Sequence, residues 1–472
     1  MSSRSKKWND VLGDYAVVPV PAGEQRTWLN VSLVYTGVLA VVAVIAIGTS
    51  LGINYSLREL IIIAVVGSLI LAFIGGLTAF IGGTTGLSTY IILRYPFGYV
   101  GSWIWGLAAS GIPSGIGWFS VQTWLFGVTV AAIAPVDSMF FDVGVAAIWG
   151  GLLMMLTAIY GYKGLSFLSY LAVPMFILVA IAGFMIGFEA TADLAELFAI
   201  EPPEPGVAIS VGITAVVGSY IVGATITADV GRFARKRHYP AIGWAIHVLF
   251  LMPLLLIGAA IMTLTTGELD FAQAMLASGM GLGVFIMVIF GFWTTNDNNL
   301  YSGALAWSVF LPLEKKVIVA LQAIVGIAIA SFVGFSAGVS MDPLISFLEI
   351  LGITVPAIAG VIIADFYLYR WWAEGSLEDR YEYDVGKEFG IIVWPGWVAA
   401  LVAIGVGGFL LEGVFIGALN VLLIAGILHP VLMIATDVLG IPSAFGSASI
   451  DETGRSPEVL EKMPGGDHIK ED

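Results

Sequence analysis

The stretch "GLGVFIMVIFGFWTTNDNNLYSGALAWSVF" (Gly281–Phe310) is a long apolar segment with a polar centre. The centre, Thr294–Asn299, contains two threonines, three asparagines and one aspartate. Because a helix has about 3.6 residues per turn, this polar run points to all sides of the helix and leaves no broad apolar face for lipid. Polar side chains in hydrocarbon are costly unless they are paired or line a cavity. The segment is therefore predicted to lie inside a bundle of membrane helices, against water, an ion or other helices.

The composition is that of a membrane protein. Of 472 residues, 58% are hydrophobic and 11% are charged, whereas soluble domains carry about a quarter charged residues. Apolar runs of about twenty residues, each long enough to cross a hydrocarbon core of about 30 Å, recur along the chain. We predict an all-α polytopic membrane protein with about twelve transmembrane helices. The predicted spans are 28–51, 58–82, 99–134, 142–160, 165–188, 207–230, 241–265, 277–303, 317–336, 343–368, 390–411 and 415–438.

The basic residues predict the orientation. With these spans, every one of the 19 Lys and Arg residues except Arg58 falls on the side of the N-terminus. Lys and Arg accumulate in cytoplasmic loops, so both termini are predicted to be cytoplasmic in a multi-pass protein of the cell (inner or plasma) membrane. The net charge of −15 has two interpretations. The excess acidic residues, including those of the tail from Ser449 onward, lie on solvated surface, or they reflect adaptation to high salt. A nucleic-acid partner is not expected, and the absence of cysteine excludes thiol chemistry.

A loose internal repeat divides the predicted spans into two sets of five. The first span contains Gly37, and the sixth contains Gly218 and Ser219, where an unwound turn is expected. The fifth and tenth spans each carry a proline, Pro174 and Pro356. An odd number of spans per repeat inverts the second copy, as in many transporters. The predicted organisation is a cytoplasmic N-terminal segment, a first five-helix repeat, an inverted second repeat, two additional helices and an acidic cytoplasmic tail: 1–27, 28–188, 207–368, 390–438 and 439–472.

Two polar constellations are candidate binding sites. Adjacent hydroxyls at Thr294 and Thr295 suit a small hard cation, and the neighbouring asparagine amides suit a planar polar ligand; the alternative is hydrogen bonding between helices. In the third span, "GIPSGIGWFSVQTW" (Gly111–Trp124) contains a proline that should kink the helix. Trp118 could provide a stacking platform, and Gln122, four residues later, offers a donor and an acceptor; the alternative is core packing.

The remaining intramembrane ionisable residues suggest no catalysis. Glu349 could relay protons or be a structural acid. Asp229 and Asp365 are expected to pair with Arg232 and Arg370. Isolated histidines in apolar runs are expected to be core residues: His247 and His429. The chain has no metal-ligand spacing, phosphate loop or nucleophile triad, so it is not expected to be an enzyme.

Four strings resemble the cytosine permease branch of the nucleobase–cation symport family: "WTTNDNNLYSGAL", "VGSYIVGATITADVGRF", "VPAIAGVIIADF" and "RYPFGYVGSW". The resemblance implies twelve spans, a five-plus-five inverted repeat with broken first and sixth helices, and two additional helices. It also implies alternating-access symport of a nucleobase or related ring, driven by sodium in some members and by protons in others.

The resemblance also implies an ion site. The hydroxyls of Thr294 and Thr295 match those that bind sodium in the family. Backbone carbonyls would come from Gly291 and, in the first span, from Gly37 and Ala40.

The implied substrate site holds a planar ring between Trp118 and Tyr220. Asn296 and the backbone near Gly218 and Ser219 complete it. Three positions depart from the cytosine permeases.

These departures bear on the substrate. A family glutamine is replaced by Gly115, an asparagine by Gly291 and a serine by Val222. In contrast, "WFSVQTW" resembles the hydantoin permease branch, whose substrate-binding glutamine matches Gln122. Cytosine, uracil, a purine, hydantoin and allantoin all remain open as substrates.

The expected function is that of a secondary active symporter. It would import a nucleobase or related planar heterocycle together with a cation, sodium being expected and a proton being the alternative. The protein is expected to act as a monomer within membrane lipid. A cation-coupled amino-acid or amine transporter of the same fold is the second hypothesis, and a channel or scaffold without transport is the third. A zwitterion would be expected to need more charge than the central residues offer, which favours the first.

Overall fold

The computed structural model describes residues 15–39, 42–134, 136–160, 162–286, 291–311, 313–377, 379–411 and 413–461. Each of the twelve predicted spans falls mainly on helix. The first half contains η1 (Ala22–Glu24), α2 (Trp28–Leu39), α3 (Val42–Asn54), α4 (Leu57–Thr85), α5 (Thr89–Ile92), α6 (Arg94–Phe97), α7 (Gly101–Gly106), the π-helical η2 (Leu107–Gly111) and η3 (Pro113–Trp118), α8 (Phe119–Ala132), η4 (Met139–Phe141), α9 (Val143–Tyr160), α10 (Tyr162–Ala190) and α11 (Leu194–Ala199).

The second half continues with the elements from α12 to α24. They are α12 (Ile209–Thr225), α13 (Ala228–Gly231), α14 (Tyr239–Ile246), the π-helical η5 (His247–Leu251), α15 (Met252–Thr266), α16 (Phe271–Ala277), α17 (Gly281–Ile286), α18 (Phe292–Ser308), α19 (Lys315–Ala337), α20 (Asp342–Ala364), the π-helical η7 (Asp365–Tyr369), α21 (Arg370–Ala373), β1 (Glu388–Val393), α22 (Trp394–Val402), the π-helical η8 (Ala403–Leu410), α23 (Gly417–Leu439), β2 (Ala444–Ser449) and α24 (Pro457–Glu461).

Many of these helices have the dimensions of membrane spans. Within the described ranges, six are long and apolar enough to cross a membrane, and four shorter helices are also apolar. The long ones are Leu57–Thr85, Ile209–Gly231, Tyr239–Thr266, Lys315–Ala337, Asp342–Ala373 and Gly417–Leu439, and the shorter ones are Val42–Asn54, Val143–Ile159, Phe176–Ala190 and Trp394–Leu410.

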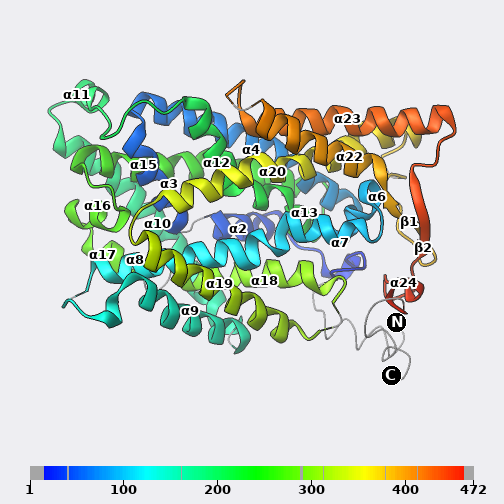
Figure 1. Ribbon diagram of the computed structural model, residues 1–472, viewed down its shortest axis with the longest axis horizontal. Helices are drawn as coiled ribbons and strands as arrows, with labels where there is room; N and C mark the ends of the chain where they lie inside the picture. Colours follow the sequence, from blue (N-terminus) through cyan, green and yellow to red (C-terminus); the bar gives the residue numbers. More distant parts are fainter. Residues whose placement is uncertain are drawn as a thin grey trace.

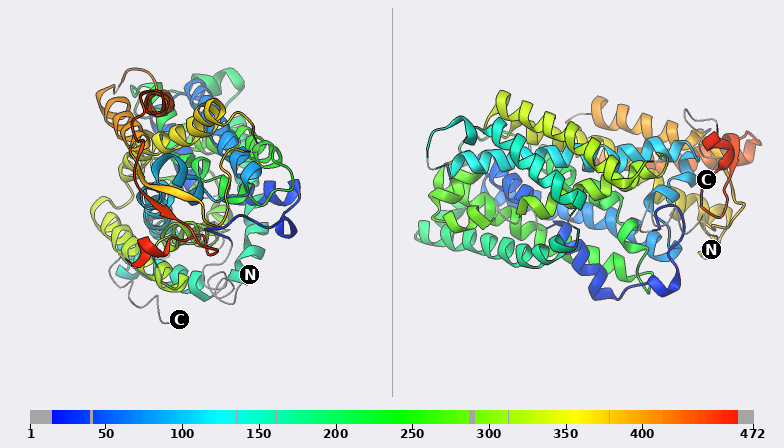
Figure 2. Two further views of the ribbon diagram at one scale, coloured as in Figure 1. Left: turned by 90° about the vertical axis from the view of Figure 1, so that its right-hand side faces the viewer. Right: turned by 90° about the horizontal axis from the view of Figure 1, so that it is seen from below.

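The helices form two packed groups that run along the long axis of the molecule (Figure 1). In the α12 group, α12 packs against α4, and α15 packs against α3 and α4. In the α18 group, α19 packs against α8, α9 and α18. Helix α20 packs against α12 and α23. The strand pair and α24 lie at one end of the molecule, called here the terminal end, and α11, α16 and α17 lie at the other (Figures 1 and 2).

The third predicted span is a continuous helical segment with widened turns around Pro113. Pro113 was expected to kink it, and its ring does lack an N–H. The backbone adapts through two π-helical stretches, in which Ile112 N donates to Leu107 O at 2.9 Å and Gly117 N donates to Ile112 O at 2.9 Å. π-Helical turns of this kind are frequent at functional sites, and this one ends at Trp118.

The sixth span is interrupted later than expected. Helix α12 runs without a break through Gly218 and Ser219 and ends at Thr225, before a turn that leads into α13. Gly218 serves close packing instead, because a Cβ there would overlap the carbonyl oxygen of Leu348 in α20. The turn is tied to the first span, since Tyr35 Oη donates to the carbonyl oxygen of Thr227 at 2.9 Å.

The helix of the eleventh span begins later than predicted, and the segment predicted as an acidic tail contributes a strand. Residues 390–393 belong to β1, which pairs with β2 in antiparallel register, Phe389 opposite Ala448. Helix α22 then starts at Trp394, with Pro395 in its first turn, where a missing N–H costs nothing. Figure 2 shows the strand pair in front of the helices at the terminal end.

Candidate functional site

The predicted ion-binding hydroxyls lie at the start of α18. Thr294 and Thr295 are both buried, and their Oγ1 atoms donate to the carbonyl oxygen of Gly291 at 3.2 and 2.8 Å. A Cβ at Gly291 would lie 2.6 Å from Val42 Cγ2 and 2.8 Å from Phe176 Cζ, so this face of α18 is turned toward α3 and α10. The structure therefore gathers three oxygen atoms at the contact of the first, fifth and eighth spans.

The first-span part of that site is described only in part. Gly37 lies near the end of α2. Ala40 lies outside the described residues, two positions before Val42. The donors that are described are hydroxyl and carbonyl oxygens without a carboxylate, a set that suits a hard cation. Among the described residues, no cluster of His, Cys, Asp and Glu could hold a metal ion.

Asn296 faces the other side of α18. It is fully buried, and its Nδ2 donates to Thr123 Oγ1 at 3.1 Å and contacts Met154 Sδ at 3.0 Å. Its amide oxygen accepts a long hydrogen bond of 3.5 Å from Asn299. Asn296 is thus held against α8 and α9, and its donor hydrogens are engaged within the protein.

Gln122 is fully buried in α8, and neither its Nε2 nor its Oε1 has a hydrogen-bond partner within the described protein. Trp118, one turn earlier, is 8% exposed and packs edge-to-face on Phe347 of α20, with 5.3 Å between ring centroids. A buried amide without partners is costly, by about 1–3 kcal/mol. An aromatic face one turn from such an amide is the arrangement that a planar ligand with polar edges requires.

Tyr220 lies within an aromatic cluster of the α12 group. Its ring stacks on Trp244 with 5.1 Å between centroids and 6° between planes, and His247 meets it edge-on at 6.1 Å. Trp244 is fixed by a hydrogen bond of 2.9 Å from its Nε1 to Leu71 O. The hydroxyl of Tyr220 is buried without a partner. The Nδ1 of His247 lies 3.1 Å from Gly243 O, and its burial in this cluster matches the expected core role.

The structure brings some of the predicted site residues together and separates others. Thr294, Thr295 and Gly291 share one face of α18, whereas Asn296 is on the opposite face. Trp118 and Tyr220 come from different helix groups, and no ring contact joins them in the described part of the chain. Ser219 Oγ donates to the carbonyl oxygen of its own helix at Val216, 2.6 Å away.

Sequence reasoning missed the residues that support these side chains. Thr123, Met154, Phe347 and Trp244 carry no pattern that distinguishes them from packing residues of a membrane helix. Only their distances to Asn296, Trp118 and Tyr220 reveal their roles. Thr123 and Met154 contact the amide of Asn296, Phe347 packs on the ring of Trp118, and Trp244 stacks on the ring of Tyr220.

The charged pairs expected near the terminal end are partly as predicted. Asp365 Oδ2 lies 3.3 Å from Arg370 Nε, as expected, and its Oδ1 lies 2.8 Å from His429 Nε2. Asp229 lies beside Arg232 as expected, since Arg232 Nε donates to the backbone carbonyl of Asp229 at 3.0 Å. The Asp229 carboxylate also accepts a hydrogen bond from Thr89 N at 2.8 Å.

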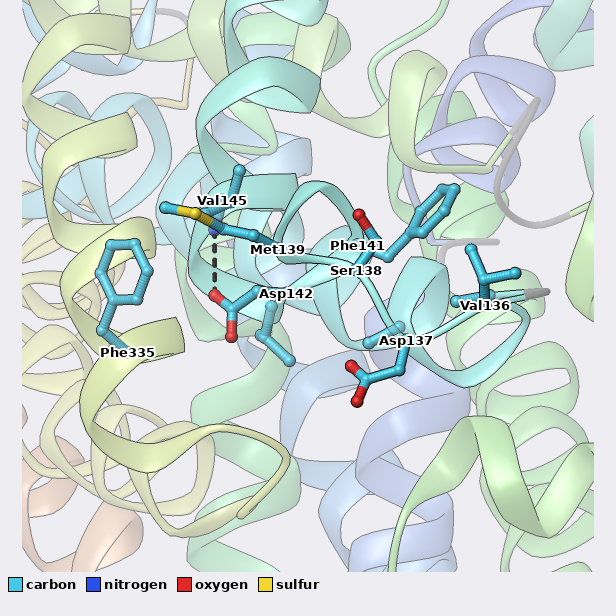
Figure 3. Close-up of a pocket in the computed structure, with 11 residues that line it drawn as sticks. Val136, Asp137, Ser138, Met139, Phe141, Asp142, Val145 and Phe335 are labelled. Carbon is cyan, nitrogen blue, oxygen red and sulfur yellow. Dashed lines mark hydrogen bonds between the residues drawn. The ribbon is translucent and has the colours of Figure 1, made fainter.

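A pocket of about 640 Å³ lies beside the connection between α8 and α9 (Figure 3). It is lined by residues of the connection between α8 and α9 and by Phe335 of α19, and it contains none of the predicted site residues. Of its two carboxylates, Asp142 caps α9 by accepting from Gly144 N at 3.0 Å and Val145 N at 3.3 Å. Because one acid is engaged in capping and no amide side chain lines the pocket, the buried residues around α18 and Gln122 remain the better candidate site.

Two solved structures of one transporter share this helical arrangement. The chain is similar to Mhp1, a nucleobase-cation-symport-1 family transporter, in a closed conformation with bromovinylhydantoin bound: the TM-score is 0.71, the identity 21%, and the match covers 90% of this chain and 96% of that one. An inward-facing conformation of Mhp1 gives a TM-score of 0.73 at 20% identity, covering 89% and 93% of the two chains. These likenesses confirm the predicted polytopic fold.

Fold and sequence together define a multi-pass membrane transporter, not an enzyme. The family described as "Permease for cytosine/purines, uracil, thiamine, allantoin" matches residues 19–435, and the chain belongs to this family. It is 28% identical over 419 residues to the cytosine permease of Escherichia coli K12, covering 88% of this chain and 94% of the relative. It is 26% identical over 345 residues, 67% of each chain, to the hydantoin permease of Microbacterium maritypicum. The domain boundaries and the site residues stay predictions.

Proposed function

We propose that this chain is a secondary active symporter that imports a planar, nucleobase-like heterocycle by alternating access, with sodium as the coupled ion. Both termini would face the cytoplasm, and the protein would act as a monomer in the cell membrane. The substrate would lie between Trp118 and Tyr220, with its polar edge on Gln122 and on the backbone near Gly218 and Ser219. Asn296 would exchange one of its present bonds for the substrate.

The observation that carries this proposal is the buried amide of Gln122. Both of its polar atoms lack partners, and it lies one helical turn from an aromatic platform. An amide can donate and accept side by side, which matches the N–H and C=O groups that alternate around nucleobases and hydantoins. Both relatives described above are permeases for compounds of this shape, cytosine and hydantoin.

Sodium is supported by the oxygen donors at the start of α18. The hydroxyls of Thr294 and Thr295 both lie within hydrogen-bond distance of the carbonyl oxygen of Gly291, and Gly291 packs against Val42 of α3. A cation there would replace the two threonine hydrogen bonds with ion–oxygen contacts. A proton is the alternative coupled ion.

The test is a thermal-stability panel on purified protein in detergent. Cytosine, uracil, purines, hydantoin, allantoin and a set of amino acids and amines are each measured in sodium and in choline buffers of equal ionic strength. A ligand at about 100 times its dissociation constant stabilises the folded state by about 2.7 kcal/mol. We expect one class of heterocycle to stabilise the protein, and to do so more strongly in sodium. Stabilisation by amino acids or amines alone would overturn the substrate class, and equal shifts in both buffers would overturn sodium coupling.

A further inference from the structure

The segment that follows β2 returns into the protein instead of leaving it. We call residues 450–456 the tail loop. Asp451 organises it: its Oδ1 accepts from Thr453 N at 2.8 Å, and its backbone N donates to Arg455 O at 2.8 Å. Arg455 is 3% exposed and Ser456 is fully buried. A basic side chain is thus placed in the interior at the terminal end, where the sequence predicted a solvated acidic tail.

The tail loop forms hydrogen bonds to the end of α18 and to Tyr99, which lies just before α7. Arg455 Nη2 donates to Ser308 O, the last residue of α18, at 2.9 Å. Ser456 N donates to Tyr99 Oη at 2.8 Å. The end of a helix carries partial negative charge on its free carbonyls, so a guanidinium there is favourably placed. Burial lowers the pKa of Arg455 to about 10, so the side chain is still charged at neutral pH.

The same loop lies against the other helix group through the N-terminal segment. Gly454 adopts a positive φ of 72°, and a Cβ there would overlap the carbonyl oxygen of Val17. Two residues before Val17, Tyr15 O accepts a hydrogen bond of 2.6 Å from Arg232 Nη1, which directly follows α13 of the sixth span. In addition, Arg94 Nη1 donates to Gly454 O at 2.8 Å. The tail loop therefore connects the end of α18 to the end of α13 through one short piece of chain.

We propose that the tail loop is a latch that holds the two helix groups together at the terminal end, and that this end opens only when Arg455 leaves Ser308. Alternating access proceeds largely by movement of one helix group against the other. A contact that spans both groups exists only while this end is closed, so its free energy adds to the stability of the closed state. The latch rests on the alternating access proposed above, and it does not depend on which substrate or ion is carried.

Accessibility of single cysteines tests this without any substrate, because the chain has no cysteine of its own. The reporter is Leu305→Cys: Leu305 is 4% exposed, lies three residues before Ser308, and belongs with Ala306 to the buried cluster that also contains Val17 and Ala228 of α13. The comparison site is Ala306→Cys, which is 2% exposed and faces Gly111 of η2 inside its own helix group. The rate of maleimide labelling is measured in detergent for each.

Each reporter is then combined with one of two substitutions. Arg455→Gln removes the latch. Arg380→Gln is the matched control, since Arg380 is also buried and also donates to backbone carbonyls. Its two acceptors, Phe366 O at 3.3 Å and Gly375 O at 3.0 Å, lie within its own stretch of chain.

We expect Arg455→Gln to speed labelling at position 305 by on the order of ten-fold, as loss of one charged hydrogen bond would give. Labelling at position 306 should stay unchanged, and Arg380→Gln should change neither. Equal acceleration by both substitutions, or none by Arg455→Gln, would overturn the latch. If Arg455→Gln does not yield monodisperse protein, Tyr99→Phe removes the hydroxyl that accepts from Ser456, and it must give the same selective change.

Discussion

Replacing Gln122 by leucine separates a binding role from a structural one, because the two roles predict opposite changes in stability. The side chain is fully buried, and both of its polar atoms lack hydrogen-bond partners within the described protein. Leucine has a similar volume but no polar group to desolvate. If the amide is kept for a ligand, the substitution should make the ligand-free protein more stable.

The magnitude follows from the cost of unpaired buried groups. Each unsatisfied polar group costs about 1–3 kcal/mol, so Gln122→Leu should raise the unfolding free energy of the ligand-free protein by at least about 1 kcal/mol. The same range, lost from the complex, should weaken substrate binding by roughly 5- to 150-fold, at 1.4 kcal/mol per factor of ten. Substrates with a donor and an acceptor on adjacent ring atoms should suffer most.

Asn296→Leu is the matched comparison, since its amide is also fully buried but bonded to Thr123 and in contact with Met154. That substitution leaves a partner unsatisfied, so the ligand-free protein should become less stable. Denaturant unfolding in detergent gives both stabilities, and a titration on monodisperse protein gives the affinities. If Gln122→Leu destabilises the ligand-free protein and binds ring substrates like the parent, the assignment of Gln122 to the substrate site is wrong.

Three further predictions concern the ion, the stacking platform and a cap outside the spans. Thr295→Ala should abolish the part of substrate affinity that depends on sodium, a coupling of typically about 1–3 kcal/mol, and Thr295→Ser should retain it; affinities in sodium and choline buffers decide this. Trp118→Ala should weaken all ring substrates in a binding titration, whereas Trp118→Phe should keep part of the affinity, and a lower melting temperature with unchanged affinity would contradict the stacking role. Asp270, which caps α16 by accepting from Gln273 N at 2.8 Å, has its carboxyl pKa raised by burial. Its protonated form is favoured in the folded state, so stability should fall as pH rises through that raised pKa, and Asp270→Asn, which preserves the cap, should flatten the dependence and be more stable than the parent at pH 7–8 in denaturant unfolding.

Much of the fold could be predicted because the membrane imposes it. Uncharged runs of sufficient length have few alternatives to spanning helices, and the polar run of α18 has no low-energy position facing lipid. The hydroxyl pair at Thr294 and Thr295 could be predicted as a candidate site because polar groups in an apolar run stand out in the sequence. Both features depend on chemistry that is local in the sequence.

What escaped prediction depends on contacts between distant residues. Gly218 was expected to mark an unwound turn, but glycine serves both flexibility and close approach, and only the carbonyl of Leu348 in α20 reveals which applies. Residues 390–393 were counted as membrane helix because they are mostly apolar, yet they pair with a strand more than fifty residues later in the register Val393 opposite Ala444. The acidic net charge of the tail from Ser449 onward predicted a solvated segment, whereas Arg455 within it is buried.

The polar run of α18 explains how one helix could link an ion to a ring. Its threonines face α3 and α10, and Asn296 faces α8 and α9, so opposite sides of a single turn contact opposite helix groups. A cation bound by Thr294 and Thr295 would fix the rotation of this turn relative to α3. The same rotation sets the position of Asn296 against Thr123 in α8, one residue after Gln122. Coupling between ion and ring then needs no long path, because the binding of each would depend on the orientation of the same rigid turn. The same helix ends at Ser308, whose carbonyl oxygen accepts the hydrogen bond from Arg455.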